Sequence, residues 1–399
     1  MSVDISQLIN PRVQRFIKEH EQEDVAELML RAGRYPEIPM REVSVQILAQ
    51  KKARHKLPEW YQLDKIVFPP PLSVEQASSE QTARFKAGLL NGQHLVDLTG
   101  GMGVDTFYLG QSFEQVDYVE QQKNLATLAT HNFQQLGASN ITVHTSDALS
   151  FLNTMSNKVD CIYLDPARRD EQARKVFQLQ DCNPDVVALQ SQLLAQSNRV
   201  LIKSAPLLDI QSAVQAFDQV SQIWVVSVKN ECKEVLYLLE ATDRKEPIIN
   251  AVNLLDNGVQ YFDFTRASEA SARAQYSEPL SYIYEPNASV LKAGAFQKIA
   301  VTYGLAKLHI NSHLYTSAHL CADFPGRIFK LLAQTKYNRK ALKSVVPDGK
   351  ANISVRNFPE SVHQIRKKTG IKDGGDVYIF ATTCIPQQRM MLVCQRITV

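Results

Sequence analysis

The sequence has no apolar run near the roughly 18 residues that a membrane-spanning helix requires, which argues against a helical membrane protein. Its amino terminus, "MSVDISQLINPRVQRF", lacks the basic and then apolar layout of a secretion signal, so we expect a cytoplasmic protein. The six cysteines form no CxxC pair, which argues against a zinc ribbon or a redox dithiol. In the cytoplasm these cysteines should be thiols. No metal is expected, since no His and Cys set has the tight spacing of metal ligands.

The composition is that of a soluble globular protein, with 399 residues, 44% hydrophobic and 21% charged, and its length predicts two or three domains. The net charge of +3 does not indicate a class of partner, but the positions of the charged residues along the chain do. Between Gly326 and Lys372, twelve Lys and Arg residues stand against Asp348 and Glu360 alone. A stretch this basic suits a polyphosphate partner. The alternative is a solvated surface whose countercharge lies elsewhere in the fold.

The first part of the chain, residues 1–72, is predicted to be a helical domain, because its apolar residues recur at helical spacing and no strand pattern competes. The segment "VFPPPLS" (67–73) is expected to stop regular structure, since proline lacks an amide donor. Ser78, with Gln81 three residues later, is expected to cap the helix that follows.

From His94 onward, short apolar strands alternate with segments long enough to form helices. The predicted strands are "HLVDL" (94–98), "QVDYVE" (115–120), "ITVHT" (141–145), "VDCIYLD" (159–165), "RVLIK" (199–203), "QIWVVSV" (222–228) and "EVLYLLEA" (234–241). Helical connections between the first five predict a parallel sheet covered on both faces. The last two are joined only by "KNECK", which permits an antiparallel hairpin. The sequence therefore predicts an α/β fold with a seven-stranded mixed sheet over residues 73–242.

The segment "LTGGMGVDTF" (98–107) follows the first predicted strand and holds Gly100, Gly101 and Gly103. A glycine turn in this position lets backbone amides approach a nucleotide beyond the carboxyl ends of the strands. The alternative is a tight turn that closes onto a helix without binding a ligand.

Three acids end or follow the first three predicted strands: Asp97, Glu120 and Asp147. Carboxylates accept hydrogen bonds, so these side chains can bind ribose hydroxyls and an adenine amino group. A nicotinamide dinucleotide is the alternative, but Thr106 stands where its fingerprint has a third glycine. S-adenosylmethionine (SAM) fits better, since Asp97 can attract its positive charges. The expected cofactor-binding residues are Asp97, Thr99, Gly100, Gly101, Gly103, Glu120, Asp147 and Ala148.

The fourth predicted strand ends in "LDPARRD" (164–170). Its Asp165 and Pro166 resemble the first half of the Asp-Pro-Pro-Tyr type of signature in SAM enzymes that methylate amino groups. Arg168 stands where that signature has an aromatic residue, so the methylated atom stays open. Arg168 and Arg169 are expected to contact phosphate, and the alternative is an ion pair with the acids that follow them.

Two further residues are expected on the substrate side of the sheet. Lys203 ends the fifth predicted strand, and Asn230 lies in the loop between the last two. Both are candidate substrate contacts. The alternative for Asn230 is a turn cap.

Several segments, in order between about residues 43 and 392, resemble bacterial class I SAM-dependent methyltransferases with a C-terminal THUMP-like domain. They are "EQASSEQTARFKA", "VDLTGGMGVDTF", "LDPARRD", "VKNECKEVLYLL", "YEPNASVLKAGAF", "HLYTS", "DFPGRIFK", "NISVRNFP" and "KDGGDVYIFATT". The resemblance implies a Rossmann-like sheet domain, an α+β ferredoxin-like module at 243–322 and a THUMP-like RNA-binding module at 323–399. In that last module, the candidate RNA contacts are the adjacent Arg366, Lys367 and Lys368.

Together, the residues and the resemblance predict a methyltransferase that acts on structured RNA, either tRNA or rRNA. We expect base methylation by in-line methyl transfer, with Asp165 and Pro166 orienting the nucleophile. Two other classes stay open: an RNA-binding adaptor without catalysis, and a methyltransferase that acts on a small molecule or a protein.

Overall fold

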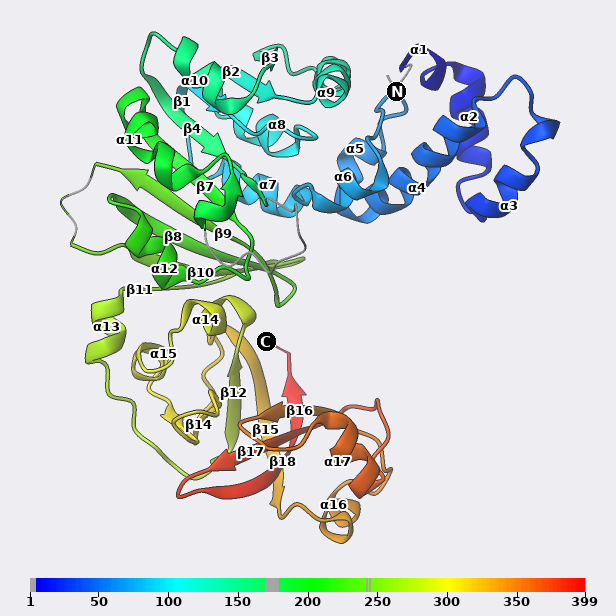
Figure 1. Ribbon diagram of the computed structural model, residues 1–399. Helices are drawn as coiled ribbons and strands as arrows, with labels where there is room; N and C mark the ends of the chain where they lie inside the picture. Colours follow the sequence, from blue (N-terminus) through cyan, green and yellow to red (C-terminus); the bar gives the residue numbers. More distant parts are fainter. Residues whose placement is uncertain (1–4, 169–178, 242, 244, 399) are drawn as a thin grey trace. The chain divides into compact units, whose positions relative to one another are not determined.

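The computed structural model describes residues 5–168, 179–241, 243 and 245–398 (Figure 1). The chain divides into two compact units, one formed by Met1–Ser221 with Val235–Arg244 and the other by Gln222–Glu234 with Lys245–Val399. The division passes through a hairpin of the large sheet. Each unit is therefore described by itself.

The N-terminal part is helical, as predicted. Its helices are α1 (Ile5–Leu8), α2 (Pro11–Glu19), α3 (Val25–Leu30), the 3-10 helix η1 (Ala32–Arg34), α4 (Met40–Lys56), α5 (Pro58–Tyr61), α6 (Pro71–Gln76) and α7 (Glu80–Ala87). Apolar side chains at helical spacing, such as Val13, Phe16 and Ile17 on α2, are buried in a common cluster. A second cluster includes Trp60 and Phe107, which packs these helices against the sheet.

Two expectations for the proline segment were wrong. Pro71 does not prevent a helix but begins α6 in its first turn, where the missing amide would have no partner in any case. The cap of α7 is Ser79, whose hydroxyl accepts from the Thr82 amide at 3.2 Å, and not Ser78. The Ser78 side chain is buried and makes other contacts.

The large sheet contains the seven predicted strands and two more. Its strands are β1 (Gly92–Asp97), β2 (Phe113–Glu120), β3 (Ile141–Thr145), β4 (Val159–Leu164), β7 (Ser197–Ser204), β8 (Val220–Val228), β9 (Glu231–Glu240), β10 (Ile248–Leu255) and β11 (Gly258–Phe264). The order is β11-β10-β8-β9-β7-β4-β1-β2-β3. Strands β1 to β4 and β7 pair in parallel, and β9 pairs antiparallel with β7, so the sheet is mixed as expected.

The expected number of seven strands was too low, because the buried apolar run of β10 pairs in parallel with β8 and adds its partner β11. Helices α8 and α9 pack on β2, α9 also packs on β3, and α11 packs on β7. The helices of this part are α8 (Val104–Gly110), α9 (Lys123–Gln135), α10 (Ala148–Thr154), α11 (Val186–Gln196) and α12 (Ile210–Ala216). A short ribbon pairs β5 (Ala167–Arg168) with β6 (Cys182–Asn183), which follows the 3-10 helix η2 (Leu179–Asp181).

The second unit holds a seven-stranded sheet in the order β13-β14-β12-β15-β18-β17-β16. Its strands are β12 (Tyr282–Pro286), β13 (Ala306–Lys307), β14 (Tyr315–Ser317), β15 (Gly326–Thr335), β16 (Asn352–Arg356), β17 (Val377–Cys384) and β18 (Gln388–Ile397). The helices are α13 (Arg266–Ser271), α14 (Ala288–Ala293), α15 (Lys298–Thr302), α16 (Arg339–Val345) and α17 (Val362–Thr369). Buried Glu285 on β12 forms ion pairs with Arg327 on β15 and Arg356 on β16.

Across the described ranges, we find no helix that combines the length and the apolar character needed to cross a membrane.

Candidate active site

The glycine turn joins β1 to α8 at the point where the strand order reverses, because β1 lies between β2 and β4. Gly101 and Gly103 have φ of +57° and +86°, in the left-handed region that favours glycine. A Cβ on Gly100 would lie 2.1 Å from the Tyr118 ring, so this position has no space for a side chain. The glycines thus permit both the turn and its close packing on β2.

Asp97 and Glu120 lie at the carboxyl ends of the adjacent strands β1 and β2, and both hydrogen-bond to the glycine turn. Asp97 is 1% exposed and accepts from the Thr99 amide at 2.9 Å and the Thr106 hydroxyl at 2.6 Å. Glu120 accepts from the Gly101 amide at 2.9 Å, and its other oxygen accepts from an amide two residues on. Burial raises the pKa of Asp97 to about 7. Both residues therefore lie beside the glycine turn, and their role in cofactor binding stays a prediction.

Asp147 and Ala148 begin the segment after the next strand, β3. The Asp147 side chain is exposed and caps α10 by accepting from the Ser150 amide at 2.9 Å. Hydrogen bonds from the Ser150 side chain and then from its amide lower the pKa of Asp147. The backbone keeps this segment beside Glu120, whose carbonyl accepts from the Ser146 amide at 3.2 Å. The capping bond uses one carboxylate oxygen of Asp147 and leaves acceptor capacity on the other.

Asp165 and Pro166 follow β4 directly, next to the glycine turn. The Asp165 amide donates to the Thr99 hydroxyl at 2.6 Å, which connects the β4 end to the β1 turn. The Asp165 carboxylate forms an ion pair with Lys203 of β7, with 2.6 Å between Oδ2 and Nζ. Pro166 is buried. The structure thus brings Asp97, Thr99, Asp165 and Lys203 to one edge of the sheet.

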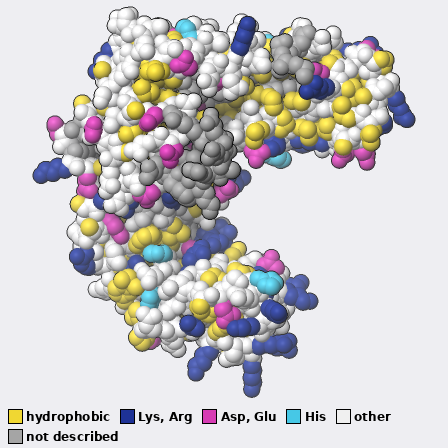
Figure 2. Space-filling model, in the orientation of Figure 1, with side chains coloured by type: hydrophobic (Ala, Val, Ile, Leu, Met, Phe, Trp, Pro, Cys, Tyr) yellow, Lys and Arg dark blue, Asp and Glu magenta, His cyan; other side chains and the backbone are white. Residues whose placement is uncertain are grey.

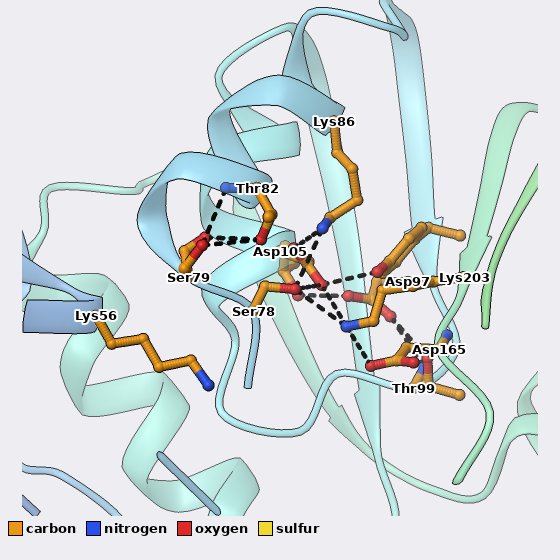
Figure 3. Close-up of polar contacts among 12 residues, drawn as sticks. Lys56, Ser78, Ser79, Thr82, Lys86, Asp97, Thr99, Asp105, Asp165 and Lys203 are labelled. Carbon is orange, nitrogen blue, oxygen red and sulfur yellow. Dashed lines mark hydrogen bonds and ion pairs between the residues drawn. The ribbon is translucent and has the colours of Figure 1, made fainter. Parts of the chain in front are cut away.

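A buried polar cluster extends this edge toward α7 and includes residues that the sequence analysis did not identify (Figure 3). Asp105, in the first turn of α8, accepts from the hydroxyls of Ser78 and Tyr163, each at 2.7 Å. Its carboxylate lies 3.2 Å from Nζ of Lys86 and 3.4 Å from Nζ of Lys203. Burial alone would raise the pKa of Asp105, but the two ammonium charges outweigh it and hold that pKa below its ordinary value.

Three other residues were expected to contact the substrate: Arg168, Arg169 and Asn230. Arg168 lies in the β5–β6 ribbon, and Arg169 lies outside the described residues. Asn230 occupies the β8–β9 turn with φ of +69°, and its side-chain oxygen accepts from the Ala288 amide at 2.7 Å. This bond connects the β8–β9 turn to the first residue of α14, 58 positions along the chain, and a substrate contact of Asn230 stays a prediction.

The basic stretch of the second unit divides into paired and exposed charges. Arg366 on α17 donates to Asp373 and to the Ala351 carbonyl, and Lys368 lies 2.8 Å from Glu360. Lys367 is exposed. Seven further exposed side chains are Lys330, Lys336, Arg339, Lys340, Lys343, Lys350 and Lys372. Figure 2 shows Lys and Arg side chains gathered over the end of this unit where Figure 1 places α16 and α17.

Within the described ranges, no group of three or more His, Cys, Asp or Glu side chains could hold a metal ion.

Comparisons with known proteins agree with this architecture. Two family models match the C-terminal part, a ferredoxin-like domain over residues 282–325 and a THUMP domain-like model over residues 326–396. We expected these modules to begin at residues 243 and 323, and these boundaries stay a prediction. Residues 245–271, before the first match, form β10, β11 and α13. A comparison with curated proteins gives no match.

A crystal structure from Porphyromonas gingivalis W83, of a protein provisionally named a methyltransferase, is similar over 100% of this chain and 100% of its own. The sequence identity is 32% and the TM-score 0.88. The chain belongs to the class I SAM-dependent methyltransferase family with a C-terminal THUMP-like domain. The predicted family and α/β fold class are therefore confirmed.

Two other bacterial structures share 14% identity with the chain. One, from Streptococcus mutans, is a provisionally named methyltransferase in complex with SAH and matches over 40% of this chain and 96% of its own, with a TM-score of 0.30. The other, an rRNA methylase from Streptococcus thermophilus, matches over 41% of this chain and 95% of its own, with a TM-score of 0.31. At these TM-scores neither structure supports an argument about the protein described here.

Proposed function

We propose that this protein is a SAM-dependent methyltransferase that acts on structured RNA, either tRNA or rRNA. The observation that carries the proposal is the joint hydrogen bonding of Asp97 and Glu120 to one glycine turn, at the reversal point of a parallel sheet. In such sheets ligands bind beyond the carboxyl ends of the strands at this reversal point.

The donor and acceptor chemistry of the turn fits SAM. Each Glu120 oxygen accepts one backbone amide, and a carboxylate oxygen can accept a second hydrogen bond, so Glu120 can also bind ribose hydroxyls. Asp147 would accept the adenine amino group, with Ala148 beside it. Asp97, in its ionised form, would attract the positive charges of the cofactor tail. The nearest atom to an ideal Cβ on Gly101 is the Thr99 carbonyl oxygen at 3.8 Å, so there is space beside this Cα, while the Gly101 amide and carbonyl are already bonded to Glu120 and Tyr118.

The chemistry at this site would be methyl transfer to a nucleophile of the RNA. When bound, SAM supplies a methyl group on a sulfonium, and in-line transfer breaks the carbon–sulfur bond with its electron pair left on sulfur. Asp165 would accept a hydrogen bond from the nucleophile and, together with Pro166, would orient the nucleophile in line with the methyl group. The Thr99 hydroxyl contacts the Asp165 amide, so the cofactor turn and the nucleophile side share a rigid connection.

Phosphate binding is assigned to the second unit. The exposed side chains Lys336, Arg339, Lys340 and Lys343, on and before α16, are not in ion pairs among the described residues. We include Lys367 of α17 in this surface. Arg366 and Lys368 belong to it as well, but their acidic partners reduce the charge that they offer to RNA. Arg168 and Arg169, of which Arg169 lies outside the described residues, remain proposed phosphate contacts.

The test is incubation of the protein with methyl-labelled SAM and total RNA from cells that lack it, followed by nucleoside analysis. We expect label in one modified nucleoside of tRNA or rRNA. Glu120→Ala should abolish SAM binding in calorimetry and leave the unfolding temperature close to that of the wild type. The matched control is Glu114→Ala, which removes an exposed acid of the same strand and should not change SAM binding.

Three results would contradict the proposal. Unchanged SAM affinity in Glu120→Ala would remove the cofactor assignment. Label that resists ribonuclease and stays with protein or small molecules would exclude RNA as the substrate. RNA binding without any affinity for SAM, measured by thermal shift, would favour an adaptor role.

A further inference from the structure

Lys203 makes contacts that do not suit a residue that binds substrate. Its ammonium lies 2.6 Å from Asp165 Oδ2, 3.0 Å from Ser78 Oγ and 3.4 Å from Asp105 Oδ2. A lysine ammonium has three N–H donors, and these three oxygens can engage all of them. The residue as a whole is also buried, with 9% exposure. Lys203 therefore has little capacity left for an RNA phosphate.

The position of this ammonium is fixed from several sides. Lys203 lies one residue beyond Ile202, which pairs with Leu164, so β7 delivers it beside Asp165 at the end of β4. From α8, Asp105 accepts from Lys203 and also contacts Lys86, which is 0% exposed on α7. Positive and negative groups thus alternate through the cluster, and a buried charge with partners on both sides has a defined place.

Asp165 is held at one oxygen only. Lys203 engages Oδ2, and among the described residues no hydrogen bond to Oδ1 is found. The Asp165 side chain is 36% exposed, whereas that of Lys203 is 11% exposed. The exposed part of the carboxylate can therefore contact a nucleophile while the ammonium holds it from behind.

We propose that Lys203 is a positioning residue that orients Asp165 for methyl transfer, and that it does not contact the RNA. The inference rests on the proposed function and adds to it the group that fixes the nucleophile-orienting carboxylate. Lys86 and Asp105 contribute indirectly, since they hold the Lys203 ammonium in place.

The test compares Lys203→Met, Lys203→Arg, Asp165→Asn and the double variant Lys203→Met/Asp165→Asn. The assay uses labelled SAM and total RNA from cells that lack the protein. Misplacement of a reacting group by about 1 Å can cost on the order of 100-fold in rate. We expect Lys203→Met to lower kcat by about 10- to 100-fold, with little change in the KM for RNA or in SAM affinity. Lys203→Arg keeps the charge and should recover part of the loss.

The double variant separates the two roles. If Lys203 acts through Asp165, then Lys203→Met should cause no further loss once Asp165 is Asn, whereas independent contacts give losses that multiply. A raised KM for RNA with unchanged kcat in Lys203→Met would overturn the proposal. If Lys203→Met does not fold, the same result in Lys203→Arg would overturn it.

A crystal structure of Lys203→Met provides a readout that does not depend on activity. We expect the Asp165 side chain to leave its wild-type rotamer, and an unchanged rotamer would contradict the positioning role. If the wild type transfers no methyl group to RNA, the proposed function fails. The rotamer of Asp165 in Lys203→Met still decides whether Lys203 positions it.

Discussion

At the scale of single residues, Asp97 is a buried carboxyl group whose charge should depend on pH near neutrality. Burial raises its pKa to about 7, against hydrogen bonds from Thr99 and Thr106 that favour the carboxylate, and the charges of Asp105 and Asp165 raise it further. A carboxyl group with this pKa is half protonated at neutral pH, so its attraction for a cationic ligand changes across the physiological range.

We therefore predict that SAM affinity rises with pH through about 7. Below this pKa, affinity should fall by up to about tenfold per pH unit, because only the ionised Asp97 attracts the positive ligand. Calorimetry from about pH 5.5 to 8.5 measures this. Asp97→Asn should bind SAM weakly and without that slope, and a slope that persists in this variant would assign the titration to another group.

The same group should have the opposite effect on the stability of the protein without ligand. The pKa of Asp97 is raised from 3.8 to about 7, so the native state binds the proton more tightly than the unfolded state does. The contribution of this group to stability is then present at low pH and is lost as pH rises from about 4 to about 7. Asp97→Asn should lack this component when unfolding temperatures are compared across the same range.

The residues of the site differ in how far the sequence could predict them. Asp97, Glu120 and Asp165 follow apolar strands directly, so strand pattern alone places them at one edge. Lys86 and Asp105 have no such signal, since a lysine on a short helix and an acid in a first turn are ordinary surface residues. Their burial depends on contacts such as that of Asp105 with Lys203, which lie 98 positions apart in the chain.

At the scale of elements, the glycine turn permits a comparison of two neighbouring positions. Gly100→Ala would place a methyl group 2.1 Å from Cε2 of the buried Tyr118 ring, so we expect a loss of about 1–3 kcal/mol or more from overpacking. Gly101→Ala meets no atom closer than 3.8 Å but keeps φ at +57°, which costs about 1–2 kcal/mol. Denaturant unfolding should rank Gly100→Ala as the less stable variant, and the reverse order would refute this packing argument.

Most elements of the first sheet were predictable because buried strands form short apolar runs between turns. The exceptions have physical reasons. A proline can begin a helix as readily as it ends one, so "PPPLS" gave the wrong prediction for α6. Two serines in succession, Ser78 and Ser79, offer the same cap chemistry, and the sequence does not say which of them is buried. Whether β10 joins the first sheet or a later module depends on its pairing with β8, which is not encoded locally.

At the scale of the whole molecule, the charge count overstated the basic character of the C-terminal stretch. Its arginines Arg327 and Arg356 both pair with buried Glu285, which lies outside the counted stretch, and Arg366 pairs with Asp373 just beyond its end. Part of the countercharge therefore does lie elsewhere in the fold, as the solvated-surface alternative required. The basic side chains that stay available for phosphate are the exposed ones on and before α16, together with Lys367 of α17.

The salt dependence of RNA binding should therefore follow exposure and pairing, not the count of basic residues. Each lysine that neutralises a phosphate adds about 0.7–0.9 to the slope of log affinity against log salt concentration. Lys340→Gln should lower that slope by about this amount and weaken binding to total tRNA at low salt. Lys158→Gln, an exposed lysine before β4 in the first unit, removes the same charge and serves as the matched control. Equal slopes in Lys340→Gln and the wild type would mean that the α16 surface does not contact phosphate, whereas a reduced slope in both variants would indicate a response to net charge alone.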